Sequence, residues 1–441
     1  MREVKHIMVY LLTIAMILPL MACGNEQPQA DNPDKIQTDV IYCPTYNPED
    51  AQATMMDFSV RFFKTSVNAP DLATRGLAEN VLISPTSVLT ALAMTANGAE
   101  NDTLDQMEAV FGIEIEPLRD YMKSYIENLP NKDKYKLHMA NSIWIKDDEN
   151  FTVNEEFIKS SEACFKAEVY EKEFNQKTLK EINKWVKKNT DGMIEESLNE
   201  IPQDAVMYLI NALAFDAEWA EIYETTQVRD GKFTLSNGMQ QDVEYMYSDE
   251  NVYLEDEKAT GFLKYYRDHK YAFAAILPNE EVGLTEYVAQ MSGESLKSLL
   301  DNAQEVQVHA SIPKFDVEDD MLLNDMLKAM GMKDVFDGSK ADLSGIGTHT
   351  AGNLFVSRVI HKTHMQVDEK GTKAGASTIV EVKCESAMES LDSKTVHLDR
   401  PFIYMIIDCE TNQPIFMGTM QQVVPMAKCG VEDVCSYPTA D

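Results

Sequence analysis

One stretch, residues 369–386, constrains the chain more than any other. It lies between two apolar, strand-like runs, residues 354–367 and a run that begins at Pro401, and no short turn closes it into a hairpin. Alternate positions carry small or apolar side chains, namely Thr372, Ala374, Ala376, Thr378, Val380, Val382 and Cys384. The positions between them are mostly charged or polar, as in a half-buried strand. We interpret the stretch as an exposed loop with the sequence of a β-strand.

The composition is that of an acidic globular chain. Its 441 residues are 44% hydrophobic and can bury a large core, and its net charge is −34. Such a charge repels phosphate backbones, so we expect no nucleic-acid partner. The chain contains no internal repeat or interdomain linker, and we predict one domain over residues 45–425 followed by a C-terminal tail, 426–441.

The N-terminus has the features of an export signal. The charged residues Arg2, Glu3 and Lys5 precede an apolar run, 7–21, that is too short to span a membrane. The run ends in Leu20-Met21-Ala22-Cys23, which resembles the bacterial lipobox. We therefore predict a lipoprotein signal peptide over residues 1–22, lipidation of Cys23 and a polar tether over 23–44. The mature chain would be anchored to the cell envelope or lie in the extracellular space; an ordinary signal peptide is the alternative.

Hydrophobic periodicity predicts a mixed α/β order along the chain. Ser84 and Pro85 are the N-cap and first residue of a helix that Gly98 ends. Asn211 is the only strongly polar residue of an apolar strand, 205–215, so a hydrogen-bonding network should surround it. Further helices are predicted over 55–67, 103–112, 180–189 and 321–330, strands over 135–145, 165–174 and 305–317, and a hairpin over 262–266 and 271–277.

No motif of a known catalytic class is present. The sequence lacks a nucleophile elbow, a zinc-protease helix, a phosphate-binding loop and a dinucleotide fingerprint. His361 and His364 fall on opposite faces of a strand, which is poor geometry for a shared metal ion. A pair of Cys384 and His361 would place the nucleophile on a loop without the rigid support that catalysis needs. We expect no enzymatic activity, no cofactor and no metal.

Several segments, taken in order, resemble the serpins. They are residues 80–87, Asn211 with Phe215 and Trp219, residues 330–346, residues 396–406 and Phe416-Met417-Gly418. The resemblance covers nearly the whole mature chain. It implies an α+β fold with three β-sheets, eight or nine helices and an exposed reactive-centre loop. It also implies that Ser84, Ser87, Asn211, Trp219 and His361 belong to the shutter and breach regions, which hold the central sheet closed.

The resemblance further implies a suicide inhibitor of serine endopeptidases, with cysteine endopeptidases as a further class. A protease cleaves the loop and forms an acyl-enzyme, and the loop then inserts into the central sheet as a new strand. The predicted hinge residues are small enough for a packed sheet: Gly371, Thr372, Ala374, Ala376 and Thr378. A non-inhibitory serpin with a binding or chaperone-like role is the alternative. We expect a monomer whose partner is the target protease.

The scissile bond is predicted at Glu385-Ser386 from the usual loop length of the family. Four neighbouring bonds between Lys383 and Glu389 are alternative cleavage sites: Lys383-Cys384, Cys384-Glu385, Ala387-Met388 and Met388-Glu389. The small or apolar choices would suit elastase-like proteases. Lys373 stands where inhibitory serpins usually carry Glu, but its side chain would point outward after insertion.

Overall fold

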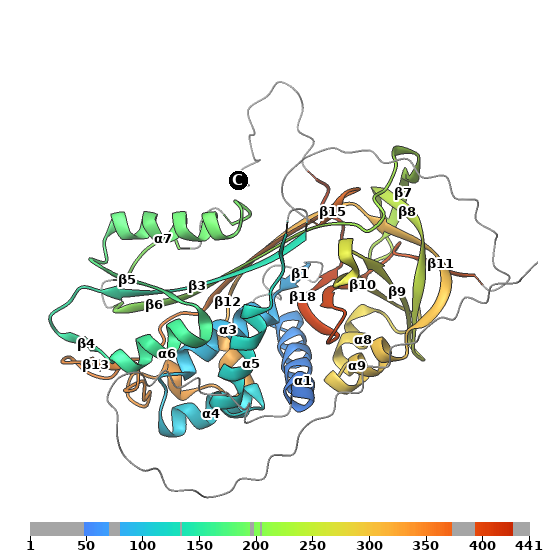
Figure 1. The fold of residues 1–441 in the computed structure, drawn as a ribbon. Coiled ribbons are helices and arrows are strands. Elements are labelled where there is room, and N and C mark those ends of the chain that lie inside the picture. The colour runs from blue at the N-terminus through green and yellow to red at the C-terminus, as the bar shows by residue number, and fades with distance from the viewer. Residues whose placement is uncertain are drawn as a thin grey trace, which may run out of the picture. The chain divides into compact units, whose positions relative to one another are not determined.

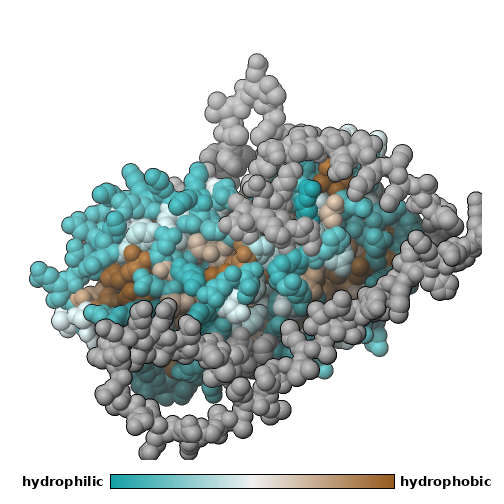
Figure 2. Space-filling view, in the orientation of Figure 1, coloured by the Kyte–Doolittle hydropathy of each residue, from teal (hydrophilic) through white to brown (hydrophobic). Residues whose placement is uncertain are grey.

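The computed structural model describes residues 48–69, 80–132, 135–194, 198–202, 205–372 and 393–426, which all lie in one compact unit, Pro44–Asp441 (Figure 1). The predicted signal peptide, Cys23, the tether and the loop after Thr372 fall outside these ranges. No helix within them is both long and apolar enough to cross a membrane. Figure 2 shows a largely hydrophilic face, in keeping with the net charge of −34.

The described residues form three sheets and nine α-helices, which confirms the α+β fold that the resemblance implies. The helices are α1 (Pro48–Val67), α3 (Pro85–Ala96), α4 (Asn101–Phe111), α5 (Ile115–Glu127), α6 (Glu155–Phe165), α7 (Gln176–Asn189), α8 (Leu284–Gln290), α9 (Gly293–Asp301) and α10 (Asn324–Met330).

The central sheet has seven strands, and two further sheets accompany it. Its strands, in spatial order, are β12 (Phe315–Leu322), β14 (Ile360–Val367), β15 (Gly371–Thr372), β6 (Met207–Glu218) and β3 (Tyr135–Lys146), and both β2 (Asn131–Lys132) and β5 (Glu168–Lys172) pair with β3. The second sheet contains β1 (Val81–Ile83), β18 (Gln413–Met420), β17 (Phe402–Asp408), β10 (Tyr271–Pro278), β9 (Ala259–Tyr265), β8 (Gln240–Glu255), β11 (Gln304–Pro313), β16 (Lys394–His397) and β7 (Val228–Thr234). The third joins β4 (Phe151–Val153) to β13 (Gly347–His349).

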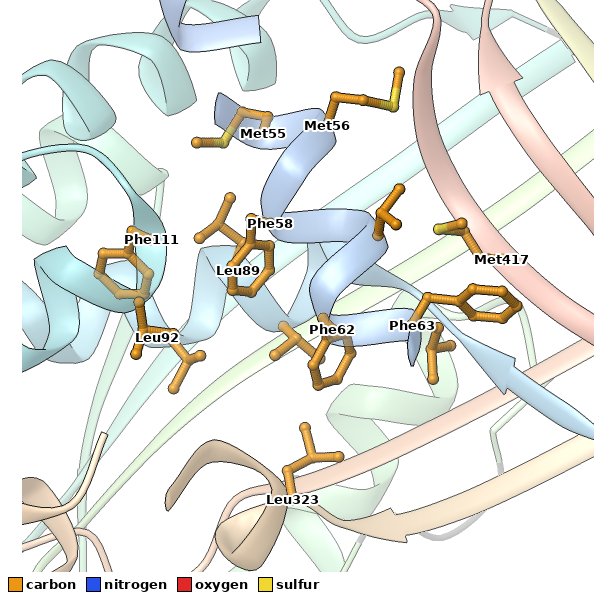
Figure 3. Close-up of a cluster of buried hydrophobic side chains, with 14 of the residues drawn as sticks. Met55, Met56, Phe58, Phe62, Phe63, Leu89, Leu92, Phe111, Leu323 and Met417 are labelled. Atoms are coloured by element: carbon orange, nitrogen blue, oxygen red, sulfur yellow. The ribbon is translucent and has the colours of Figure 1, made fainter. Parts of the chain in front are cut away.

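Helices cover both faces of the central sheet (Figure 1). On β3, Ile143 faces the main core while its neighbour Trp144 faces α7, as the period of two in a strand requires. The main core gathers around α1, whose Phe58 and Phe62 contact Leu89 and other apolar side chains (Figure 3). Burying an aromatic side chain of this size contributes about 1.5–3 kcal/mol. The predicted burial of β6 holds from Ala212 to Phe215, whereas its first five residues are only half-buried because they line a cavity.

Several predicted elements have the expected structure. The side chain of Ser84 caps α3 by accepting from the backbone of Ser87, and Pro85 is the first helical residue. Gly112 ends α4 in a left-handed conformation, with φ of 80°. Strands β9 and β10 pair antiparallel on either side of a short turn, as the predicted hairpin requires.

The helices predicted over 55–67 and 180–189 begin earlier than predicted, at Pro48 and Gln176. Four other predicted boundaries were wrong, because contacts with distant segments outweigh the local pattern. The run 305–317 is two strands: residues up to Pro313 pair with β8 in the second sheet, and Phe315 onward pairs with β14 in the central sheet. The predicted helix 321–330 begins only at Asn324, because Met321 pairs with His361 in the strand ladder.

The other two wrong boundaries are strand starts. Within the run 354–367, the strand begins only at Ile360. The residues before it make their backbone hydrogen bonds to segments outside the sheet: the amide of Val356 donates to the carbonyl of Val335 at 2.8 Å. The predicted strand 165–174 shrinks to β5, because Phe165 is the last residue of α6 and packs in the main core.

Candidate functional site

The central sheet is open between β6 and β14. Strand β6 pairs with β3 on one side, and β14 pairs with β12 along its whole length. Among the residues that the structure describes, only the two of β15 lie between them: Gly371 opposite Glu218, and Thr372 opposite Ala217 and Val367. No direct pairing joins β6 to β14 in the described part of the chain. The backbone of each strand therefore faces a gap beyond Thr372.

A cavity of about 630 Å³ occupies this gap. Its sides are β6 and β14, where Leu209 and Thr363 face it. Val88 of α3 lines one end, and Val186 of α7 with Met193 of the following segment lines the other. The cavity thus passes through the sheet from α3 to α7.

The N-terminus of α3 connects the two strands that flank the gap. The backbone N–H of Ser84 donates to Nε2 of His361 on β14 at 2.9 Å. The hydroxyl of Ser87 donates to Oδ1 of Asn211 on β6. The amide of Ser87 also donates to the hydroxyl of Ser84 at 3.3 Å. The structure brings these four predicted residues together, and α3 supplies the connection that a strand ladder would otherwise make.

His361 is neutral in this network. It is 5% exposed, and burial lowers its pKa to about 4. Its Nε2 accepts from Ser84, which only an unprotonated nitrogen can do. No group of three or more potential metal ligands is found among the described residues.

Sequence reasoning missed one member of the network, Asn141. It lies opposite Asn211 in the β3–β6 register and accepts from its side-chain amide at 2.8 Å. Its own amide donates to the carbonyl of Phe165 at 2.7 Å. The signal was a lone Asn in the apolar part of the strand predicted over 135–145.

Trp219 lies apart from the other four, where β15 joins the sheet. Its indole N–H donates to the carbonyl of Asp368 at 2.8 Å, and its backbone N–H donates to the carbonyl of Lys370 at 2.8 Å. The indole stacks on Tyr266 at 4.5 Å between ring centroids, and the Tyr266 hydroxyl is hydrogen-bonded to that of Thr372. Trp219 therefore fixes the backbone that leads into the loop.

At Gly371 the absence of a side chain allows β15 to approach β6 closely. A Cβ added there would lie 2.0 Å from the carbonyl oxygen of Ala217, so only glycine allows this close approach. Thr372 beside it is 3% exposed. The remaining hinge residues Ala374, Ala376 and Thr378, and the predicted bond Glu385-Ser386, lie outside the described residues.

A buried ion pair beneath Trp219 was also missed from the sequence. Nζ of Lys264 is 2.8 Å from Oε1 of Glu250, and it lies 4.3 Å from the ring centroid of Tyr223 and 5.4 Å from that of Trp219. Burial opposes the charge of Lys264, but Tyr223 and Glu250 outweigh it, so the pKa of Lys264 is raised. The pair joins β8 to β9, which no local pattern reveals.

Comparison with known proteins decides the family. A family model described as "Serpin (serine protease inhibitor)" matches residues 53–423. The chain belongs to the serpins. It is 30% identical over 355 residues to leukocyte elastase inhibitor of Xenopus laevis, which covers 77% of this chain and 92% of that protein. It is also 30% identical over 359 residues to human antithrombin-III, which covers 77% of this chain and 76% of that protein.

Solved structures agree with this assignment. The native state of the thermophilic serpin tengpin superposes with a TM-score of 0.79 at 44% identity, over 87% of this chain and 96% of that one. Human thyroxine-binding globulin superposes with a TM-score of 0.73 at 23% identity, over 85% of this chain and 99% of that one. The second likeness concerns the fold alone.

Proposed function

We propose that this serpin is a suicide inhibitor of serine endopeptidases and that its cleaved loop enters the gap between β6 and β14. One observation carries the proposal: the first two residues of the loop already lie between these strands, antiparallel to both. A chain that continues from Thr372 in the same direction would follow both unpaired edges. Its backbone groups would satisfy those of β6 and β14 and fill the cavity of about 630 Å³.

The side-chain pattern of the loop fits this gap. Thr372 shares the inner face with Ala217 and Val367, because directly opposed residues in antiparallel strands lie on one face. Ala374, Ala376 and Thr378 would follow on that face, against α3. Lys373 and the residues that alternate with these would face α7. The small side chains of the loop would thus occupy the packed side of the gap. Burying a charged side chain there would make insertion less favourable by several kcal/mol.

The chemistry of the trap is an acyl transfer. The serine hydroxyl of the protease attacks the carbonyl of Glu385, its proton passes to the departing amine, and Ser386 becomes a free N-terminus. The loop stays joined to the protease through an ester. Insertion from Thr372 onward would then carry the protease along the sheet and distort its active site before water attacks the ester.

A protease panel that includes elastase-like enzymes tests the proposal. We expect an inhibitor–protease complex that survives SDS, together with a released C-terminal peptide. Mass spectrometry of that peptide identifies the scissile bond among the candidates from Lys383 to Glu389. Cleavage without a stable complex across the panel would contradict inhibition and favour a binding serpin, a class for which thyroxine-binding globulin is a structural neighbour.

We also propose that the serpin is exported and lipid-anchored through Cys23. The lipobox-like end of the apolar run supports this proposal. Cells fed a labelled fatty acid should incorporate it into the wild-type protein and not into Cys23→Ala. Labelling of both proteins would contradict the assignment.

A further inference from the structure

The chain turns from β14 into β15 over three residues, and two aromatic residues hold this turn. Trp219 donates its indole N–H to the carbonyl of Asp368 and its backbone N–H to that of Lys370, both at 2.8 Å. The backbone N–H of Tyr223 donates to the carbonyl of Glu369 at 2.9 Å. Every carbonyl of the turn therefore accepts a hydrogen bond from the segment that follows β6.

Both aromatic residues contact the ammonium group of Lys264, which comes from β9. Its Nζ lies 4.3 Å from the ring centroid of Tyr223 and 5.4 Å from that of Trp219. Both distances are within the range of cation–π attraction, which is stronger where water is excluded. Lys264 is 2% exposed, Tyr223 5% and Trp219 1%. One buried cation therefore contacts both residues that hold the turn.

Glu250 on β8 fixes the position of this cation. Its Oε1 lies 2.8 Å from Nζ of Lys264 and accepts from the hydroxyl of Ser248 at 2.6 Å. The hydroxyl of Ser248 is also 3.3 Å from that of Tyr223. Since the carboxylate takes the single hydrogen of the serine hydroxyl, the phenol is the donor to Ser248. Tyr223 is thus held at its ring by Lys264 and at its hydroxyl by hydrogen bonds that end on the partner of the same lysine.

Packing alone does not require a charged pair at this position. Apolar side chains of similar volume often give the same stability as a buried ion pair, or more. They would fill the space beside Tyr223 and Trp219, but they have no directional interaction with either ring. The ammonium of Lys264 and the carboxylate of Glu250 do have one, so the pair fixes how the two aromatic side chains lie.

We propose that Lys264 is a positioning residue for loop insertion: it orients Trp219 and Tyr223, which keep the turn formed while the loop is cleaved. The inference rests on the proposed function. With the turn formed, the cleaved loop only has to extend β15, because the first residues of the new strand are already ordered. Without it, insertion must also supply the conformational entropy of ordering those residues. Water then has more time to attack the ester that joins the loop to the protease.

The double variant Lys264→Met with Glu250→Leu separates positioning from stability. Its apolar side chains fill the site without a buried charge, so the free energy of unfolding should stay close to the wild-type value. Ser248 and Tyr223 keep each other as hydrogen-bond partners. Phe111→Leu is the matched control, because it removes apolar contacts from the main core and α4 lies well apart from β15 (Figure 1).

Hydrogen exchange measures the state of the turn without a protease. The amides of Trp219 and Tyr223 donate to the turn, so their protection reports on it. In the double variant they should exchange roughly two- to tenfold faster than in the wild type, the range of one net hydrogen bond. The amides of β17 should exchange equally in both proteins. Equal exchange of Trp219 and Tyr223 in the two proteins would overturn the inference.

The stoichiometry of inhibition, the number of serpin molecules consumed for each protease molecule trapped, supplies the second readout. It exceeds one when ester hydrolysis competes with insertion. This excess should be roughly two- to tenfold larger in the double variant and unchanged in Phe111→Leu. A wild-type value in the double variant, or an equal rise in Phe111→Leu, would overturn the inference. If even the wild type traps no protease, the proposed function fails, and hydrogen exchange still decides whether Lys264 holds the turn.

Discussion

Acidification should weaken the connection between β14 and α3 through His361. Protonation turns its Nε2 into a donor that faces the N–H of Ser84, so the hydrogen bond at 2.9 Å becomes a contact between two donors. The charged ring would also be buried, and no carboxylate in the described part of the chain offsets that cost. The folded state therefore disfavours the protonated form.

The magnitude follows from the pKa. It falls from the ordinary 6.5 to about 4. A depressed pKa in the folded state gives stability that is present above 6.5 and lost as the pH falls toward 4. At about 1.4 kcal/mol for each pH unit between the two values, the loss is about 3 kcal/mol.

Urea unfolding of the wild type and His361→Gln measures this loss. The Gln side chain is neutral and offers Ser84 an acceptor oxygen. Carboxylates titrate equally in both proteins, so the difference between their stabilities isolates His361. Between about pH 7.5 and about pH 4.5 the wild type should lose about 2–3 kcal/mol more than the variant. Equal losses would refute the assignment of a neutral, buried His361.

Three further substitutions have defined outcomes. Lys264→Met leaves Glu250 buried without its cationic partner and should lower the free energy of unfolding in urea by about 3–5 kcal/mol. The double variant Lys264→Met with Glu250→Leu should recover most of this loss. An unchanged midpoint in the single variant would contradict burial of the pair. Gly371→Val cannot keep β15 in the sheet, so its thermal unfolding midpoint should fall, and an unaltered midpoint would argue against the close contact with β6. Ala376→Arg should be cleaved without forming a complex. Ser377→Arg, one residue on, should still inhibit, because after insertion its side chain would face α7; equal behaviour of the two variants would rule out the predicted alternation of inward and outward positions.

The inward position of Thr372, at the start of the loop hinge, could be predicted from the sequence. Period two put Thr372 among the inward positions, and the structure buries it between Ala217 and Val367. The polar position of Asn211 in an apolar strand predicted a network, and Ser87 and Asn141 supply it. In both cases a local pattern carries the information, because alternation and burial are properties of a single strand.

Contacts between distant segments could not be predicted in this way. The alternation of residues 305–317 is continuous, yet the chain changes sheets at Lys314 because its neighbours change from β8 to β14. The ion pair of Lys264 and Glu250, and the bond from His364 to Asp316, each depend on the register of two strands. A single sequence contains no periodic signal for register between strands that are far apart.

Hydrogen exchange of β6 and β14 before and after loop cleavage tests loop insertion most directly. Within the described residues of the intact serpin, the amides of both strands that face the gap have no strand partner beyond Thr372. If the cleaved loop becomes the missing strand, these amides should gain protection, while those paired with β3 and β12 should change little. Unchanged exchange at the gap-facing amides after complete cleavage would contradict insertion.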